Sequence, residues 1–141
     1  MSTYGIKQLS VFVENKKGEL TDITTLLSQN GISLKSINLV DSSDFGILRI
    51  IVDDTLKAKE ILDKNGFSLT ITEVFAALID DHIGSFNEVV STLSQHGINI
   101  EYTYTISNNQ NGAFIFKVNP EEFDNATQIL HESKVELITA I

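Results

Sequence analysis

The heptapeptide ENKKGEL at residues 14–20 combines residue types that can hold a small charged molecule. Asn15 carries both a hydrogen-bond donor and an acceptor, so its amide suits either end of a zwitterion. Gly18 has no Cβ and lets a ligand approach the backbone closely. A helical pattern starts directly afterwards, and the N-terminus of a helix offers unpaired N–H groups and partial positive charge to a carboxylate. We therefore predict a ligand-binding loop made by Asn15, Lys17, Gly18, Glu19 and Leu20.

A second stretch, DDHIGSF at residues 80–86, repeats this layout with different chemistry. Asp81 takes the place of Asn15, and Gly84 takes the place of Gly18. A carboxylate accepts a hydrogen bond from an ammonium group but repels another carboxylate. The two loops are therefore not equivalent, and we place the fuller site at Asn15.

Simpler roles remain open for these residues. Either glycine can serve only to make a tight turn from strand to helix, and Asn15 can cap or bridge its loop. His82 stands beside Asp80 and Asp81, but a transition-metal site needs several aligned donors, and the sequence clusters no further ligands here. We predict no metal and no cofactor.

Both loops belong to an internal repeat. SQNGISL (28–34) and SQHGINI (94–100) are related by a shift of 94 − 28 = 66 residues. The same shift relates Leu20 to Phe86 and Leu48 to Phe114, whereas AKEIL (58–62) matches ATQIL (126–130) at a shift of 68. Several glycines and apolar positions in one register indicate a duplication. We predict two modules, at residues 1–72 and 73–141.

Each copy predicts the same order of elements from its apolar periodicity and turn residues. In the first copy these are a strand at Ile6–Val13, a helix over Leu20–Leu27 that ends at Gly31, strands at Leu34–Val40 and Ile47–Val52 joined by DSSDFG, a helix at Leu56–Leu62 and a strand at Phe67–Thr72. In the second copy they are a strand at Val74–Ile79, a helix at Ser85–His96, strands at Ile100–Ile106 and Ala113–Val118, a helix at Glu121–Glu132 and a strand at Val135–Thr139.

This β-α-β-β-α-β order predicts the α+β class and two tandem ferredoxin-like modules. Each module has a four-stranded antiparallel sheet with both helices on one face. Residues 68–79 join the copies without glycine or proline, so we expect the modules to dock side by side. Apolar residues lie on both faces of Ile47–Val52, so the second face of the sheet is either ordinary apolar surface or a covered surface for self-association. We predict a homodimer.

The composition narrows the function. The chain has 141 residues, 42% of them hydrophobic, with no cysteine and a net charge of −9. Arg49 is the only arginine, whereas nucleic-acid binding needs basic residues to neutralise phosphates. No secretion signal or membrane-spanning run stands out, and the lack of cysteine fits a cytoplasmic protein. No phosphate loop, dinucleotide fingerprint, zincin motif or nucleophile elbow is present, so we predict no enzymatic activity.

The two copies resemble ACT domains, the small ligand-binding modules found on many amino-acid-metabolic enzymes. VENKKGEL (13–20) is similar to the family's Asn-x-Pro-Gly-x-Leu loop, and NGISL and HGINI are similar to its Gly-Ile/Val-Asn-Ile step into the second strand. Lys17 and Ile83 stand where the family usually has proline, Ser33 where it usually has asparagine, and Val13 where some members have histidine.

The resemblance implies that ligand sites form where two modules meet, the glycine loop of one facing the start of the second strand of the other. Two sites follow from that expectation: a fuller one made by Asn15, Gly18, Asn99 and Ile100, and a degenerate one made by Asp81, Gly84, Ser33 and Leu34.

We therefore predict a non-catalytic regulatory protein that binds an amino acid and acts through a partner enzyme or through self-assembly. The main alternative is a structural subunit that acts by protein contact and binds no metabolite. A small enzyme of the same topology is a further alternative, because fold alone does not fix function.

Overall fold

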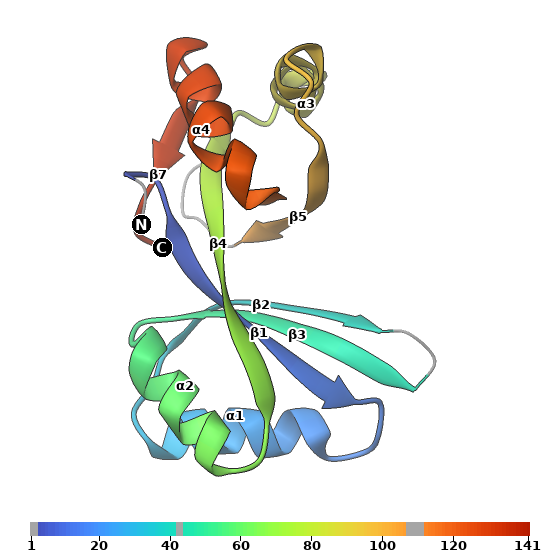
Figure 1. Cartoon of the computed structure of the whole chain (residues 1–141), viewed down its shortest axis with the longest axis vertical. Coiled ribbons are helices and arrows are strands. Elements are labelled where there is room, and N and C mark those ends of the chain that lie inside the picture. Colours follow the sequence, from blue (N-terminus) through green and yellow to red (C-terminus); the bar gives the residue numbers. More distant parts are fainter. Residues whose placement is uncertain (1–2, 42–43, 107–111) are drawn as a thin grey trace. The chain divides into compact units, whose positions relative to one another are not determined.

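The computed structural model of the chain describes residues 3–41, 44–106 and 112–141 (Figure 1). The chain divides into two compact units. The N-terminal unit comprises Lys7–Thr72, and the C-terminal unit comprises Glu73–Ile141 together with the described residues before Lys7. Tyr4 belongs to the C-terminal unit, where its hydroxyl lies 3.2 Å from Nδ1 of His131. None of the helices in the described part of the chain is both long and apolar enough to cross a membrane.

The N-terminal unit is one antiparallel sheet with two helices on one face (Figure 1). Its strands lie in the order β2-β3-β1-β4, and β3 is antiparallel to both β1 and β2. The elements are β1 (Ile6–Glu14), α1 (Glu19–Gln29), β2 (Leu34–Asp41), β3 (Phe45–Val52), α2 (Thr55–Lys64) and the first part of β4 (Ser68–Ile79). β2 is therefore an edge strand of this unit.

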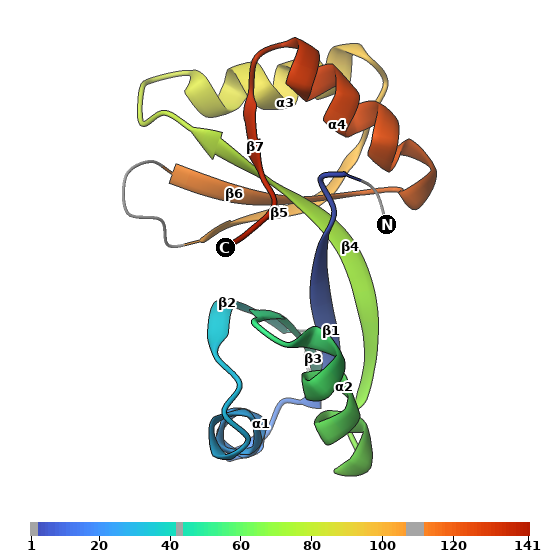
Figure 2. The ribbon, with the colours of Figure 1, turned by 90° about the vertical axis from the view of Figure 1, so that its left-hand side faces the viewer.

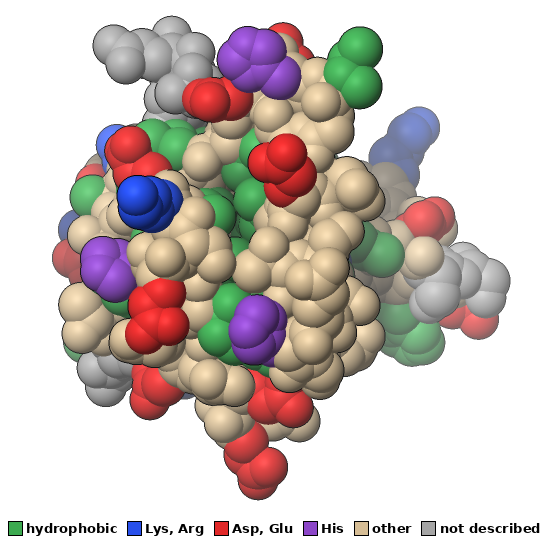
Figure 3. Space-filling view, turned by 90° about the horizontal axis from the view of Figure 1, so that it is seen from above, with side chains coloured by type: hydrophobic (Ala, Val, Ile, Leu, Met, Phe, Trp, Pro, Cys, Tyr) green, Lys and Arg blue, Asp and Glu red, His purple; other side chains and the backbone are tan. Residues whose placement is uncertain are grey.

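The C-terminal unit repeats this plan. Its elements are the rest of β4, α3 (Ser85–Gln95), β5 (Ile100–Ile106), β6 (Gly112–Val118), the short 3₁₀ helix η1 (Pro120–Glu122), α4 (Phe123–Glu132) and β7 (Glu136–Ile138). β4 pairs antiparallel with β6 and β7, and β5 pairs antiparallel with β6. α3 and α4 lie together on one face of the sheet (Figure 2). Acidic and histidine side chains stand out on the helical face of this unit, where Lys and Arg are scarce (Figure 3).

Alternation along the strands builds both cores, because successive side chains point to opposite faces of a sheet. In the N-terminal unit, Leu9 and Val11 of β1 and Leu48 and Ile50 of β3 are fully buried in one cluster with α1 and α2. In the C-terminal unit, Phe75, Ala77, Phe116 and Val118 are buried with α3 and α4 in the same way. The two sheets thus present corresponding faces to their helices.

The predicted fold class and element order are confirmed, with two local differences. The two strands predicted at Phe67–Thr72 and Val74–Ile79 are one strand, β4, because nothing between them breaks the extended backbone. The last helix starts with the 3₁₀ turn η1 at Pro120, where the side chain of Asn119 accepts a hydrogen bond of 2.9 Å from the backbone of Glu121. The predicted connection at 41–46 includes residues 42–43, which lie outside the described part of the chain.

Candidate functional site

The predicted loop between β1 and α1 is a tight turn that delivers the chain into the helix N-terminus. The backbone N–H of Lys16 donates to the carbonyl of Glu14 over 2.9 Å, and the N–H of Asn15 donates to the carbonyl of Asp44 over 3.0 Å. Gly18 is the N-cap of α1 with φ of 90°, a left-handed conformation that favours glycine, and no side chain caps the helix there. The first amides of α1 therefore have no side-chain acceptor from the N-cap residue.

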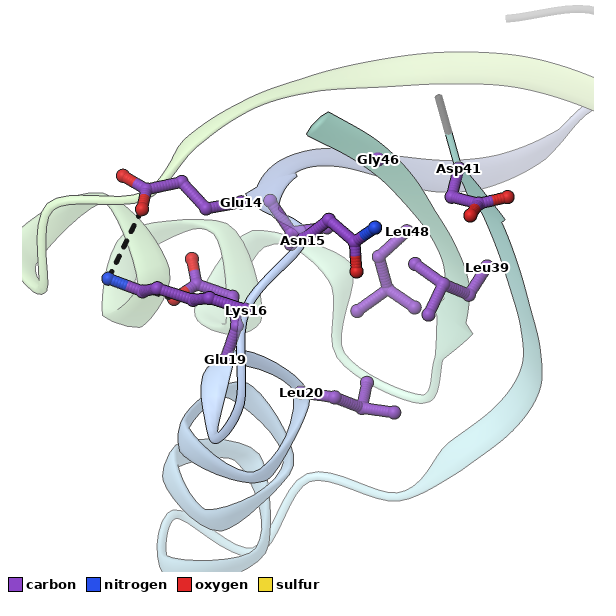
Figure 4. Close-up of a pocket in the computed structure, with 10 residues that line it drawn as sticks. Glu14, Asn15, Lys16, Glu19, Leu20, Leu39, Asp41, Gly46 and Leu48 are labelled. Carbon is purple, nitrogen blue, oxygen red and sulfur yellow. Dashed lines mark ion pairs between the residues drawn. The ribbon is translucent and has the colours of Figure 1, made fainter. Parts of the chain in front are cut away.

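A cavity of about 70 Å³ opens beside this loop, within the N-terminal unit. Figure 4 shows Leu20, Leu39 and Leu48 around its apolar side, with the side-chain amide of Asn15 beside Leu48 and above Leu20. The lining residues come from β1, the loop, α1, β2 and β3, and they are Val13, Glu14, Asn15, Lys16, Glu19, Leu20, Leu39, Asp41, Gly46 and Leu48. A space of this size exceeds the roughly 10–15 Å³ that one water needs, and is far smaller than the ~300–1,000 Å³ of pockets for drug-sized ligands.

The polar edge of the cavity is dominated by an ion-pair cluster. The ammonium of Lys16 lies 3.2 Å from the carboxylate of Glu14 and 3.9 Å from that of Glu19 (Figure 4). The hydrogen bond that the Lys16 ammonium donates to the Glu14 carboxylate is the main cause that raises the pKa of Lys16, and the negative charge of Glu14 is the next. With Asp41, three carboxylates and one lysine line the cavity. This edge therefore favours a positively charged group of a ligand.

Three of the predicted site residues line this cavity: Asn15, Glu19 and Leu20. Gly18 and Lys17 lie in the same loop but do not line it. Ser33 and Leu34 lie at the start of β2, whereas Leu39 and Asp41 reach the cavity from its end. The backbone N–H of Ser33 donates to a carboxylate oxygen of Asp53 over 2.9 Å. This hydrogen bond fixes the backbone at the start of β2.

The predicted residues of the C-terminal unit occupy corresponding places in their own module. Asp81 and Gly84 lie in the exposed loop between β4 and α3, and Gly84 is the N-cap of α3 with φ of 87°. Asn99 is exposed just before β5, and Ile100 is half-buried against the core of this unit. How these residues combine with Asn15 stays a prediction.

Most residues that line the cavity are not among those predicted for the site. The sequence predicts Leu39 and Leu48 only as strand residues, and Gly46 and Asp41 only as part of the connection between strands. The alternation of a strand tells which side chains share a face, but not where the helix above leaves part of that face uncovered. Among the apolar lining residues, only Leu20 belongs to the predicted loop, and it is 40% exposed.

No group of three or more His, Cys, Asp or Glu side chains within the described residues could hold a metal ion. His82 lies in the exposed turn before α3, where its backbone N–H donates to the carbonyl of Asp80 over 3.0 Å. The cavity itself has an apolar side, a mixed polar edge and the N-terminus of α1 beside it.

Two ferredoxin-like modules in tandem, one with a small pocket at its strand-to-helix loop, define the class of this protein. A family model described as "ACT domain pair" matches residues 4–140. The chain thus belongs to the ACT domain pair family, which consists of regulatory domains.

Solved structures are also similar to the chain. Protein BT0572 from Bacteroides thetaiotaomicron is 38% identical to the chain, with a TM-score of 0.87, covering 97% of this chain and 94% of that one. The regulatory subunit of aspartate kinase from Thermus thermophilus, in its ligand-free form, is 14% identical with a TM-score of 0.66, covering 92% of both chains. Its counterpart from Thermus flavus is 14% identical with a TM-score of 0.64, covering 91% of this chain and 92% of that one. At 14% identity these similarities show the fold. Among proteins with curated functions, none matches the chain.

Proposed function

We propose that the chain is a non-catalytic regulatory protein that binds a free amino acid with a short aliphatic side chain in the cavity of its N-terminal unit. The observation that carries this proposal is the position of the cavity, which lies between the Asn15 loop, the first turn of α1 and an aliphatic wall. Each part of that setting suits one part of such a ligand.

The aliphatic wall would take the side chain of the ligand. Leu48 is fully buried, whereas Leu20 is 40% and Leu39 is 50% exposed. A ligand that covered Leu20 and Leu39 would remove apolar surface from water, which stabilises a complex by about 25 cal/mol per Å². The volume of about 70 Å³ sets a limit on the size of the group that enters.

The loop and the helix would take the charged ends. The amides at the start of α1 suit the carboxylate, because they carry the partial positive charge of the helix N-terminus. The oxygen of the Asn15 side chain and the neighbouring carboxylates suit the ammonium group. The pairing of this loop with Asn99 and Ile100 stays part of the proposal.

Thermal denaturation of the full chain with each of the twenty amino acids tests the proposal. A ligand at 100 times its dissociation constant stabilises the folded state by about 2.7 kcal/mol, so the correct amino acid raises the melting temperature. Calorimetric titration then compares wild type with Asn15→Ala, Asn99→Ala and the matched control Asn125→Ala on the exposed side of α4. We expect Asn15→Ala and Asn99→Ala each to weaken binding about tenfold, as loss of a hydrogen bond to a charged group does, and the control to leave it unchanged.

Failure of every amino acid to raise the melting temperature would favour the alternative, a subunit that acts by protein contact alone. Unchanged affinity in Asn15→Ala would refute the place of the site. Unchanged affinity in Asn99→Ala would refute only the pairing of the two loops.

We further propose that the regulatory output passes through a partner enzyme or a second copy of the chain. The Thermus proteins of similar fold, described as regulatory subunits of an enzyme, support the first route. Exposed apolar side chains on the sheet of the N-terminal unit support the second, with Phe12 53%, Val40 44% and Phe45 61% exposed. Light scattering on the purified protein tests the second route, which predicts a dimer mass that Phe12→Ser and Phe45→Ser convert to a monomer mass.

A further inference from the structure

The loop between β1 and α1 and the loop between β4 and α3 have closely similar backbones. Lys16 and His82 occupy the same turn position, with N–H···O distances of 2.9 Å to Glu14 and 3.0 Å to Asp80. The N-caps agree as well, since Gly18 has φ of 90° and ψ of −12°, and Gly84 has φ of 87° and ψ of −7°.

The strands beside the loops are also in the same register. Val13 pairs with Gly46 in the N-terminal unit, and Ile79 pairs with Gly112 in the C-terminal unit. The next pairs also correspond: Leu39 faces Leu48, and Thr105 faces Phe114. Positions related by the 66-residue shift therefore occupy corresponding places in the two modules.

The side chains at these places differ in size. Leu20 and Leu48, which line the cavity, correspond to Phe86 and Phe114. The two rings lie against each other with centroids 4.9 Å apart and planes tilted by 42°. Phe86 also stacks on the fully buried Phe116, with centroids 6.0 Å apart. Ring contacts of this kind are favourable beyond the area that they bury. The rings thus occupy the space that is open between the leucines of the N-terminal unit.

The C-terminal unit has a hollow elsewhere, but this hollow does not correspond to the cavity of the N-terminal unit. It lies on the α4–β7 side of α3, and its lining includes Asp80, Ser85, Glu88, Lys134 and Glu136 but neither Phe86 nor Phe114. Its walls are mainly polar, so it lacks the aliphatic side of the cavity in the N-terminal unit.

We propose that the ring pair Phe86–Phe114 occludes the ligand pocket of the C-terminal unit, so that each chain takes one ligand at this position, in the N-terminal unit. This inference rests on the proposed function for its ligand, but the occlusion itself concerns the side chains alone. Leucine at these two positions, as in Leu20 and Leu48, leaves a module able to bind the ligand, whereas phenylalanine, as in Phe86 and Phe114, prevents binding.

Xenon probes the occlusion without reference to the natural ligand, because it enters apolar cavities. Methyl NMR of the full chain under xenon pressure reports which cavity fills. We expect the methyl signals of Leu20, Leu39 and Leu48 to shift in the wild type and that of Thr105 to stay fixed. In the double variant Phe86→Leu with Phe114→Leu, the Thr105 methyl signal shifts as well. Phe114→Leu alone gives the same readout if the double variant does not fold.

The reverse exchange closes the natural cavity. Leu20 is partly exposed, so Leu20→Phe has room to be accommodated, and we expect the xenon shifts of Leu39 and Leu48 to be lost. A Thr105 shift in the wild type equal to that of Leu39, or a silent Thr105 in a folded Phe-to-Leu variant, would overturn the occlusion.

The stoichiometry of amino-acid binding separates the proposed function from the proposed occlusion. Titration of the wild type with the amino acid found by thermal denaturation should give one bound ligand per chain, and Leu20→Phe should abolish it. A stoichiometry of two would overturn this inference and leave the proposed function intact. The expected xenon pattern with no binding of any amino acid would overturn the proposed function and leave the occlusion supported.

Discussion

The loop before α1 and the loop before α3 share a backbone conformation but differ in their side chains. Both turn through a glycine in the left-handed region, and both open into an eleven-residue helix. The flanking strands keep the same register in both units. Only the side chains differ: leucines leave a cavity of about 70 Å³ in one unit, and phenylalanines meet at 4.9 Å in the other.

This difference separates what the fold requires from what a ligand requires. A glycine that is present in both loops explains the turn, because both loops need positive φ whether or not they bind anything. Side chains that differ between the loops carry the information about binding. The polar position differs in the same way, since Asn15 corresponds to the carboxylate of Asp81.

The largest expected effect on stability comes from truncating Phe114, which fills space in the C-terminal unit, or Leu48, which borders the cavity of the N-terminal unit. Phe114→Ala should destabilise the C-terminal unit by about 3 kcal/mol, since Phe→Ala in a core costs ~3–5 kcal/mol and Phe114 is only half-buried. Leu48→Ala should destabilise the N-terminal unit by about 2 kcal/mol, the lower end of its class, because Leu48 already borders empty space.

Urea unfolding followed by NMR signals of each unit measures both values. Leu56→Ala is the matched control, because Leu56 is 63% exposed and should change stability by less than about 0.5 kcal/mol. If Leu48→Ala proved more costly than Phe114→Ala, the cavity would be better packed than its volume indicates.

Substituting the N-cap glycine of α1 or of α3 should lower stability by a smaller amount, and by the same amount in both loops. Gly18→Ala and Gly84→Ala each force a side chain into left-handed backbone, which costs roughly 1–2 kcal/mol. A Cβ at either position meets no atom within 4 Å, so no steric term adds to this cost. Unequal losses in urea unfolding would contradict the equivalence of the two turns.

The fold could be predicted from the sequence because it depends on local patterns. The alternation Leu9, Val11, Val13 gave β1, and the helical spacing of Ile23, Leu26 and Leu27 gave α1. Gly31 ends α1 as expected: its φ is 70°, and Ile32 donates to the carbonyl of Leu27 over 3.0 Å. The element boundaries at 68–79 were missed, because a run without turn residues does not reveal that two strands are one.

The site could be predicted only in part. The loop chemistry drew attention to Asn15 and Leu20, which line the cavity. Leu39 and Leu48 carry no local signal, because their contribution depends on the distance between α1 and the sheet. The repeat did hold a signal: Leu20 and Leu48 both change to phenylalanine in the second copy. Two apolar positions that enlarge together mark neighbours in space, and here they mark the wall of a pocket.

The smallest expected effect on stability concerns the residue after Asn15. This residue is Lys16 in the N-terminal unit, and His82 corresponds to it in the C-terminal unit. Lys16→Gln removes the ion pair of 3.2 Å with Glu14. Both side chains are largely exposed, so the loss of stability is small and is weakened further by added salt.

The pH dependence of this effect has a definite sign. The pKa of Lys16 is raised in the folded state, first by its hydrogen bond to Glu14. The ion pair therefore stabilises the fold fully below the ordinary pKa of lysine, about 10.4, and this contribution is lost as pH rises through the raised value. The stability difference between wild type and Lys16→Gln in urea should stay constant from pH 7 to about pH 10 and vanish above the raised pKa. A difference that grew over that alkaline range would show that Lys16 acts through packing of its aliphatic chain and not through its charge.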